Sequence, residues 1–181
     1  PLLRSPLPGR HTLPAALAAV GCAIALGVDL ESALEAVAST SIEGRARIIT
    51  ARSGATIIDD RYNASPASVL GDLQMLAATN GRRLALLGKM AELGDFAEAE
   101  HRRVGEAAAR SCDVLASFGD LGRVVVEAAR ADGMGAAHWF PTREEADSFL
   151  AADLGPGDTV LVKGSRSEAL ELVLPILEGR P

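Results

Sequence analysis

Apolar and polar positions alternate along most of the chain in a pattern that predicts strands followed by helices. Short apolar or β-branched runs indicate the strands, and a stretch with helical periodicity follows each of them after a short loop. The pattern predicts strands at 55–59, 83–87, 114–118, 136–140 and 159–162, and helices at 66–80, 97–110, 121–131, 143–152 and 168–177. Strands and helices in this alternation predict βαβ units and a mainly parallel sheet.

Two of the predicted strands are apolar on both faces, at 84–87 and 160–162. Because such strands need cover on both sides, we expect an α/β fold, a Rossmann-like and mainly parallel sheet with helices on both faces. A β-branched run at 46–51 precedes the first strand, and the polar residues 52–54 between them predict a hairpin.

Residues 1–43 differ in character from the rest of the chain. The stretch 13–26 is rich in Ala and apolar nearly all round, so we expect a helix that is buried on most sides. Thr12 can cap its start, Gly27 can end it, and Asp29 can cap a second, shorter helix. We expect these residues to be a helical remnant of another domain that precedes the α/β domain at 44–181.

Helix-end signals support the pattern in the α/β part. Ser65 can cap the helix at 66–80, with Pro66 in its first position and Gly81 after its end. Thr142 can cap the helix at 143–152 in the same way. These signals therefore favour the same boundaries as the periodicity does.

Composition and charge narrow the class of protein. With 181 residues and 48% hydrophobic content, the chain can hold one sizeable domain, or one domain and a remnant of another. The net charge of −6 and the 3% content of aromatic residues argue against a nucleic acid as partner. Without a membrane-length apolar run or a signal sequence, we expect a cytoplasmic protein with Cys22 and Cys112 as buried free thiols.

Common cofactor motifs are absent from the sequence. No strand is followed by G-x-G-x-x-G, which argues against a nicotinamide or flavin enzyme. Lys163-Gly164-Ser165 has the wrong order for a Walker phosphate loop. The three histidines and two cysteines lack the spacing of metal ligands, so we expect no metal site in this chain.

Polar residues end the first predicted strand, where ligands bind in open α/β sheets. Asp59 and Asp60 could simply solvate the strand end, but Tyr62, Asn63 and Ser65 add further donors and acceptors at a helix start. This density of polar groups favours a site for a polar substrate.

The last predicted strand ends in a similar way. Lys163, Ser165 and Arg166 combine cations, a hydroxyl and free backbone N–H groups, which suit a carboxylate or a phosphate. Arg45, beside a glycine at the domain boundary, is a candidate phosphate clamp. His11 lies ahead of the first helix and is ambiguous from its sequence context alone.

Together these segments resemble the C-terminal part of the Mur ligase family, over essentially the whole chain. The resemblance rests on Gly9-Arg10-His11, Gly44-Arg45, Asp59-Asp60-x-Tyr62-Asn63-Ala64-x-Pro66-x-Ser68, Leu87-Gly88-x-Met90-x-Glu92-Leu93-Gly94, His101-x-x-Val104-Gly105 and Val162-Lys163-Gly164-Ser165-Arg166. Within the family, the segments are most similar to the enzymes that add D-Ala-D-Ala to a UDP-linked muramoyl tripeptide.

The resemblance implies a ligase of peptidoglycan precursor synthesis that forms an amide through an acyl phosphate, with ATP and Mg²⁺. It implies that 1–43 end a central ATPase domain and that 44–181 form the C-terminal domain. ATP would contact His11, Arg45 on the phosphate side and Asp60 at the ribose.

The remaining site residues are also implied by the resemblance. Asn63 and Ser65 would lie near the reacting end and the incoming dipeptide, and Lys163 and Ser165 would help to hold the dipeptide. No catalytic or metal-binding residue is assigned in this chain.

The sequence departs from the family pattern near the expected site, at Thr12, Pro14, Arg61, Ser65 and Lys89. The accepted dipeptide or amino acid is therefore open. Alternatives are another Mur ligase, a folylpolyglutamate synthetase-like ligase, and a non-catalytic binding module with the same fold.

The chain begins Pro1-Leu2-Leu3 rather than with Met, so we expect it to be a piece of a longer protein. The resemblance implies that the uridine-binding domain, the phosphate loop and the Mg²⁺ ligands precede it. We therefore expect the chain alone to be inactive and to bind ATP weakly.

Overall fold

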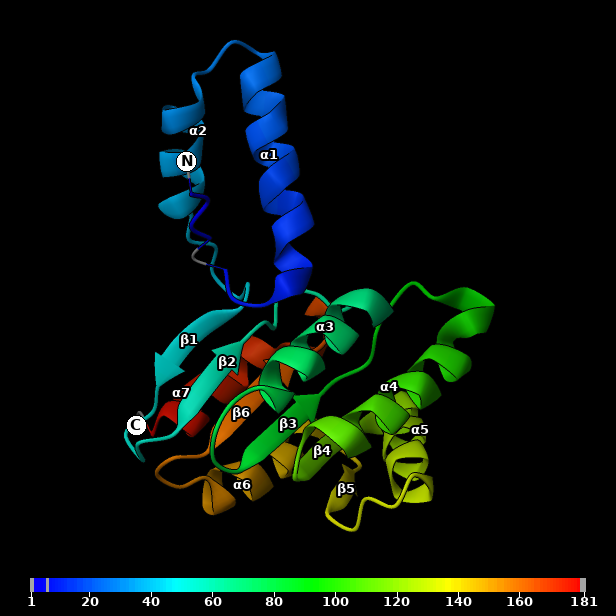
Figure 1. Ribbon diagram of the computed structural model, residues 1–181. Helices are drawn as coiled ribbons and strands as arrows, with labels where there is room; N and C mark the ends of the chain where they lie inside the picture. The colour runs from blue at the N-terminus through cyan, green and yellow to red at the C-terminus, as the bar shows by residue number, and fades with distance from the viewer. Residues whose placement is uncertain (1, 6, 180–181) are drawn as a thin grey trace.

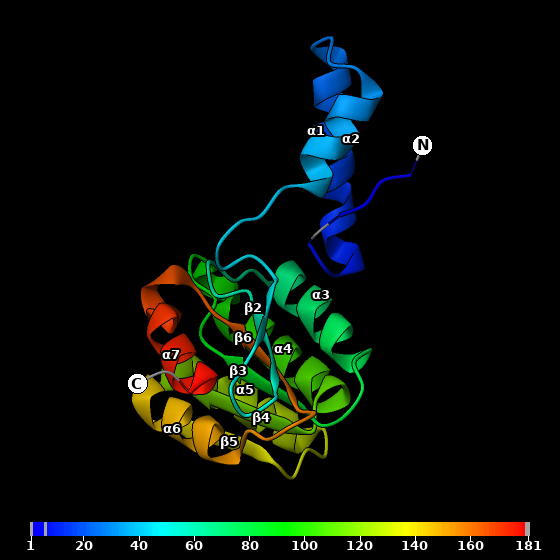
Figure 2. The ribbon, with the colours of Figure 1, turned by 90° about the vertical axis from the view of Figure 1, so that its left-hand side faces the viewer.

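The computed structural model describes residues 2–5 and 7–179, which form a helical hairpin and an α/β body (Figure 1). Helices α1 (Leu13–Ala25) and α2 (Leu30–Ala38) lie side by side and project away from the body, as the turned view also shows (Figure 2). The short 3₁₀ helix η1 (Arg10–Thr12) leads into α1 close to the body. Among the described residues, no helix combines the length and apolar character that a membrane crossing needs.

The body is built on a six-stranded sheet in the order β1-β2-β6-β3-β4-β5. Its strands are β1 (Arg47–Thr50), β2 (Thr56–Asp59), β3 (Arg83–Leu87), β4 (Val114–Phe118), β5 (Ala137–Phe140) and β6 (Thr159–Lys163). All neighbouring strands are parallel except β1 and β2, which form the antiparallel hairpin expected from the sequence.

Helices cover both faces of the sheet, which confirms the predicted fold class. They are α3 (Pro66–Ala77), α4 (Ala97–Ser111) and α5 (Gly119–Ala131) on one face, and α6 (Arg143–Asp153) and α7 (Val173–Glu178) on the other. Successive residues of β3 divide between the two cores, since Leu87 packs with α3–α5 and Leu86 packs with α6 and α7. This alternation is the reason why β3 is apolar at nearly every position.

Three of the predicted helix caps are confirmed. The Ser65 hydroxyl accepts a hydrogen bond from the Ser68 backbone N–H, and the Ser68 hydroxyl accepts one from the Ser65 backbone N–H, so the pair forms a capping box at α3. Asp29 caps α2 and Thr142 caps α6. Thr12 does not cap α1, because its hydroxyl donates instead to the Gly9 carbonyl (2.8 Å).

The predicted helix at 168–177 is wrong in its first half. The chain forms two 3₁₀ turns, η3 (Arg166–Glu168) and η4 (Leu170–Leu172), and an α-helix begins only at Val173. Ala169 between the turns has a left-handed backbone (φ +49°), which interrupts a right-handed helix. Its carbonyl accepts a hydrogen bond from the Arg143 guanidinium (2.6 Å), so a tertiary contact holds this break.

The prediction that α1 is buried on most sides is also wrong. Among the described residues of α1, Val20 is the one that is buried, and Leu17 is 60% exposed. The apolar pattern is real, but α2 covers one side of the helix and leaves the rest to solvent. For the same reason Cys22 is exposed, whereas Cys112 is buried as expected, and both thiols are free.

Candidate functional site

The two polar strand ends that the sequence singles out meet in space. Strands β2 and β6 are parallel neighbours, and their carboxyl ends bring Asp60 and Lys163 together. The Lys163 ammonium forms an ion pair with Asp60 Oδ2 and donates to the Asn63 backbone carbonyl (3.3 Å). Lys163 is only 1% exposed, so this cation belongs to the interior of the protein.

Asp60 is held from two directions. Its Oδ1 accepts a hydrogen bond from the Ala46 backbone N–H (2.9 Å), and Lys163 contacts its other oxygen. Burial raises the pKa of Asp60, but the contacts with Asp72, Lys163 and the Ala46 N–H outweigh burial and hold the pKa below its ordinary value. The carboxylate is therefore ionised and fixed in orientation at neutral pH.

Asp72 is a member of the site that the sequence reasoning missed. It lies on α3 with no exposed surface, and its Oδ2 is 2.8 Å from Lys163 Nζ. Burial raises the pKa of Asp72 to about 7, because desolvation outweighs the attraction of Lys163. Its place in the helix could have indicated that it is buried, because Asp72 falls on the same helical face as Val69 and Leu76, which are buried.

His11 reaches the same cluster from the N-terminal segment. Its Nε2 lies 3.1 Å from Asp72 Oδ1. Burial and the Lys163 ammonium lower the pKa of His11, so the imidazole is neutral at pH 7. Four titratable side chains from four separate segments therefore converge at the carboxyl end of the sheet.

A cavity of about 430 Å³ opens beside this cluster, between the helical hairpin and the body. It is lined by Ser5, Leu7, His11, Thr12, Ala15, Ala16, Ala19, Val37, Thr40, Ile42, Arg45, Ala46, Asp60 and Ser68. All three residues predicted to contact a nucleotide, His11, Arg45 and Asp60, thus share one cavity. A mostly apolar hollow with a few convergent polar groups is the usual form of a small-molecule site.

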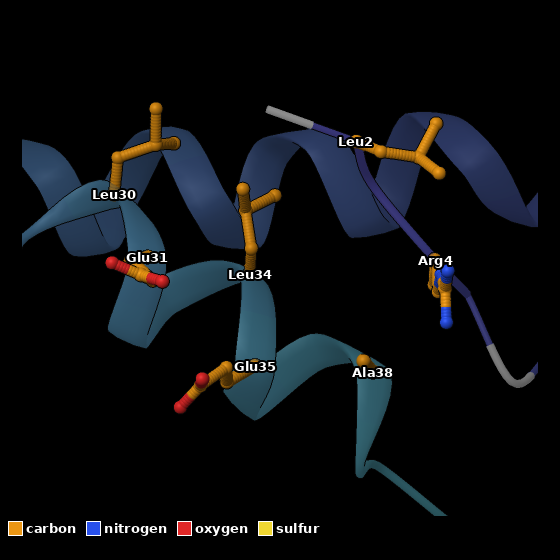
Figure 3. A pocket seen from close by; sticks show the side chains of 7 residues that line it. All are labelled: Leu2, Arg4, Leu30, Glu31, Leu34, Glu35 and Ala38. Atoms are coloured by element: carbon orange, nitrogen blue, oxygen red, sulfur yellow. The ribbon is translucent and has the colours of Figure 1, made fainter.

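A larger hollow of about 550 Å³ lies elsewhere, between the N-terminal segment and α2 (Figure 3). Its lining is Leu2, Arg4, Leu30, Glu31, Leu34, Glu35 and Ala38. None of the predicted site residues is in this lining. We place the candidate site in the smaller cavity because the buried charges converge there.

Aromatic and cationic side chains lie at the edge of the site. The Arg45 guanidinium stacks over the Tyr62 ring, 4.4 Å from its centroid, and Arg166 approaches the same ring at 5.6 Å. Arg45 and Tyr62 are exposed. Tyr62 therefore links the segment before β1 to the turn after β6.

The residues predicted to bind a dipeptide separate into exposed and buried groups. Asn63 and Ser65 are exposed, and Ser65 is engaged in the α3 cap. Lys163 and Ser165 are buried. The Ser165 hydroxyl pairs with the Ser167 hydroxyl (2.9 Å), and its backbone N–H donates to the Lys89 carbonyl (2.9 Å).

The loop after β3 packs directly on the loop after β6. The Gly88 N–H donates to the Lys163 carbonyl (2.8 Å), and a Cβ on Gly164 would lie 3.1 Å from Gly88 Cα. Two glycines are needed for this approach of backbones. Lys89 pairs with Glu168 across the contact (3.2 Å), so its cation is directed toward the turn after β6.

His101, one of the residues on which the family resemblance rests, is a structural residue with no exposed surface. Its Nε2 accepts a hydrogen bond from the Met90 N–H (2.9 Å), so Nδ1 carries the proton and donates to the Ala97 carbonyl (2.6 Å). The imidazole thus ties the loop after β3 to the start of α4.

A pH dependence of stability follows from His101. Burial lowers its pKa from 6.5, so its contribution is complete above pH 6.5 and is lost as pH falls through the folded-state value. We expect His101→Gln to lower the unfolding free energy at pH 7 by about 1–3 kcal/mol, and by less at pH 5. Urea unfolding at both pH values measures this, with His138→Gln as control, since His138 is partly exposed. Equal losses at both pH values would contradict it.

Among the described residues, no group of three or more His, Cys, Asp or Glu side chains is placed to hold a metal ion. Asp60 and Asp72 already share the Lys163 ammonium, which occupies the position that a cation would take between them. The charge between these two carboxylates is therefore balanced by the protein's own ammonium group.

Comparison with known proteins gives the family. Residues 44–166 match the model of the Mur ligase, glutamate ligase domain. UDP-N-acetylmuramoyl-tripeptide–D-alanyl-D-alanine ligase of Escherichia coli is 34% identical over 177 residues, which are 96% of this chain and 38% of that protein. The chain thus spans well under half the length of this curated relative.

Solved structures agree with the sequence comparison. MurF from Acinetobacter baumannii superposes with a TM-score of 0.85 at 30% identity, over 98% of this chain and 40% of that one. MurF ligase from Thermotoga maritima in complex with ADP has a TM-score of 0.73 at 26% identity, over 88% of this chain and 36% of that one. With a family match that covers more than half of its residues, the chain belongs to the Mur ligase family.

Proposed function

We propose that this chain is the C-terminal, substrate-binding part of an ATP-dependent ligase that adds D-Ala-D-Ala to UDP-N-acetylmuramoyl-tripeptide. The observation that carries the proposal is similarity to enzymes of that name along nearly the whole chain. The convergence of His11, Arg45 and Asp60 on one cavity supports it independently. In this proposal residues 1–43 end the central ATPase domain and residues 44–181 form the C-terminal domain.

The chemistry of such a ligase has two steps. The terminal carboxylate of the muramoyl tripeptide accepts the γ-phosphoryl group of ATP, which gives an acyl phosphate and ADP. The amine of the dipeptide then attacks the acyl carbon, and the tetrahedral intermediate loses phosphate to leave an amide. Rates in such reactions depend on positioning and on stabilisation of charge. Mg²⁺ would offset phosphate charge, with ligands from outside the described residues.

On the nucleotide side, the proposed roles follow from charge and placement. Asp60 is ionised and fixed by the Ala46 N–H and Lys163, so its free acceptor capacity suits ribose hydroxyls. Arg45 is exposed at the cavity and can turn its guanidinium to a phosphate. His11 lines the same cavity. The Thermotoga maritima relative in complex with ADP supports a nucleotide as the ligand.

On the dipeptide side, exposure separates direct from indirect roles. Asn63 and Ser65 are exposed and could touch a substrate, whereas Lys163 and Ser165 are buried. We propose that Lys163 affects the substrate indirectly. Its ammonium donates to the Asn63 carbonyl and so fixes the backbone that presents the Asn63 side chain. Ser165 supports the turn after β6 in a similar way.

The test is a pair of arginine variants in the complete gene product that contains this sequence. Arg45→Ala should raise the Kd for ATP roughly 10- to 100-fold, because a charge-assisted hydrogen bond is worth about 1.5–3 kcal/mol. Arg47→Ala is the matched control, since Arg47 is exposed on β1 and is not in the cavity lining. Its Kd for ATP should not change.

Activity is measured as phosphate release that requires both UDP-N-acetylmuramoyl-tripeptide and D-Ala-D-Ala. Release that needs another amino acid in place of the dipeptide would favour a different Mur ligase or a folylpolyglutamate synthetase-like ligase. Nucleotide binding without release under any of these conditions would favour a non-catalytic module.

A further inference from the structure

Asp72 occupies a central place among segments that are distant in the chain. It projects from α3 with no exposed surface, and Lys163 from β6 lies on one side of its carboxylate. His11 from the N-terminal segment lies on the other side. Lys163 Nζ lies 2.8 Å from Asp72 Oδ2 and His11 Nε2 lies 3.1 Å from Asp72 Oδ1, although neither contact has the angles of a hydrogen bond. One carboxylate thus stands between the helical part of the chain and the sheet.

The His11 ring is seated in a space that only glycines leave open. A Cβ on Gly71 would lie 2.5 Å from His11 Cγ, and a Cβ on Gly9 would lie 2.7 Å from His11 Cε1. Gly9 also has a positive φ of 90°. Because Gly71 precedes Asp72 on α3, the absence of its side chain is what allows the imidazole to reach the Asp72 carboxylate.

The Lys163 ammonium is fully engaged in this arrangement. It forms ion pairs with Asp60 and Asp72 and donates a hydrogen bond to the Asn63 carbonyl. If Asp72 were neutral and unable to hold the ammonium, Lys163 would keep Asp60 and Asn63 but lose its third restraint. The position of Asp60 in the cavity therefore depends on Asp72 through Lys163.

We propose that Asp72 is a positioning residue of the cavity: it holds Lys163 and His11 on opposite sides of its carboxylate, and so fixes Asp60 and joins the N-terminal segment to the sheet. The proposal depends on the proposed function only for the identity of the ligand, a nucleotide. Asp72 does not line the cavity, so its effect on a ligand passes through His11 and Asp60.

The ionisation of Asp72 allows a test that a purely structural role of this residue would not affect. Lys163 and Asp60 are the charged groups that act on Asp72, and His11 faces it from the third side. Burial raises the pKa of Asp72 to about 7, so the carboxyl changes charge near neutral pH while it touches the His11 ring. The NMR signals of His11 should therefore report two ionisations, its own and that of Asp72.

The experiment compares Asp72→Asn with Asp147→Asn in the complete gene product that contains this sequence. Asp147 is a matched control, because it is also fully buried, has a pKa raised by burial to about 6, and lies on α6 across the sheet. We expect a transition near pH 7 in the His11 ring signals of the wild type and of Asp147→Asn, and none in Asp72→Asn. The Kd for ADP, followed by NMR titration, should rise about tenfold in Asp72→Asn alone.

Each outcome decides a separate point. An unchanged His11 titration in Asp72→Asn, or equal changes in the two variants, would overturn the role of Asp72. If ADP does not bind the wild type, the nucleotide proposal fails, while the His11 titration still decides the role of Asp72. If Asp72→Asn does not fold, Gly71→Ala takes its place, since the new Cβ must displace the His11 ring and remove the transition near pH 7.

Discussion

Replacing Lys163 with Met is expected to lower the unfolding free energy by about 3–5 kcal/mol at pH 8, as breaking a buried ion pair does. The side chain is 1% exposed, and the substitution roughly keeps its volume while removing a cation that contacts both Asp60 and Asp72. Two buried carboxylates are then left without their partner. Urea unfolding of the full chain, followed by circular dichroism, measures the loss.

The loss should become smaller at pH 5, because the abandoned carboxyl groups can take up protons and become neutral. For the same reason, Lys163→Met combined with Asp72→Asn should recover part of the stability. Lys89→Met is the matched control, since the Lys89 side chain is 45% exposed where it pairs with Glu168, and surface pairs contribute about 0–1 kcal/mol. Equal losses for the two lysines would show that the ion pairs of Lys163 with Asp60 and Asp72 do not stabilise the fold more than a surface pair does.

Replacing Gly105 with Ala is expected to cost about 3 kcal/mol, near the upper end for overpacking of a core. Gly105 lies where α4 packs against α5, and an added Cβ would lie 2.2 Å from the Val125 carbonyl oxygen and 2.8 Å from Ala128 Cβ. A backbone oxygen within a helix cannot rotate away, so the two helices must separate. Thermal and urea unfolding measure the change.

The control for this substitution is Gly21→Ala in α1. Gly21 is also inside a helix, but nothing lies within 4 Å of its added Cβ. Helix propensity then acts alone and should stabilise α1 by about 0.5–1 kcal/mol. The two variants carry the same chemical change, so opposite signs would assign the cost of Gly105→Ala to the α4–α5 contact. A neutral result at Gly105 would mean that the contact can relax without cost.

The strands could be predicted from the sequence because their signals are local. Apolar runs bounded by polar turns predict β3 and β4 at their observed limits, and the Ser65 and Thr142 caps fix the starts of α3 and α6. These features depend on residues that are neighbours in the chain. No distant contact overrides these local signals.

The features that escaped prediction depend on distant contacts. Ala169 is left-handed where Arg143 holds its carbonyl, and nothing in the local sequence indicates a break there. The apolar pattern of α1 predicts burial, but a pattern does not say which neighbours are present. Asp72 was overlooked because one acidic residue in a helix is ordinarily a solvated one, and its partners lie 61 and 91 positions away, at His11 and Lys163.

The place of β6 in the sheet has a consequence for the order of folding. It is the last strand among the described residues, yet it lies between β2 and β3, which are made much earlier. During synthesis, these two strands each present an unpaired edge, a known hazard for aggregation, until residues 159–163 arrive. The same arrival delivers Lys163 to Asp60 and Asp72. Closure of the sheet and neutralisation of its buried acids are thus one late event, and a nascent chain cut short before it keeps both open edges and both uncompensated acids.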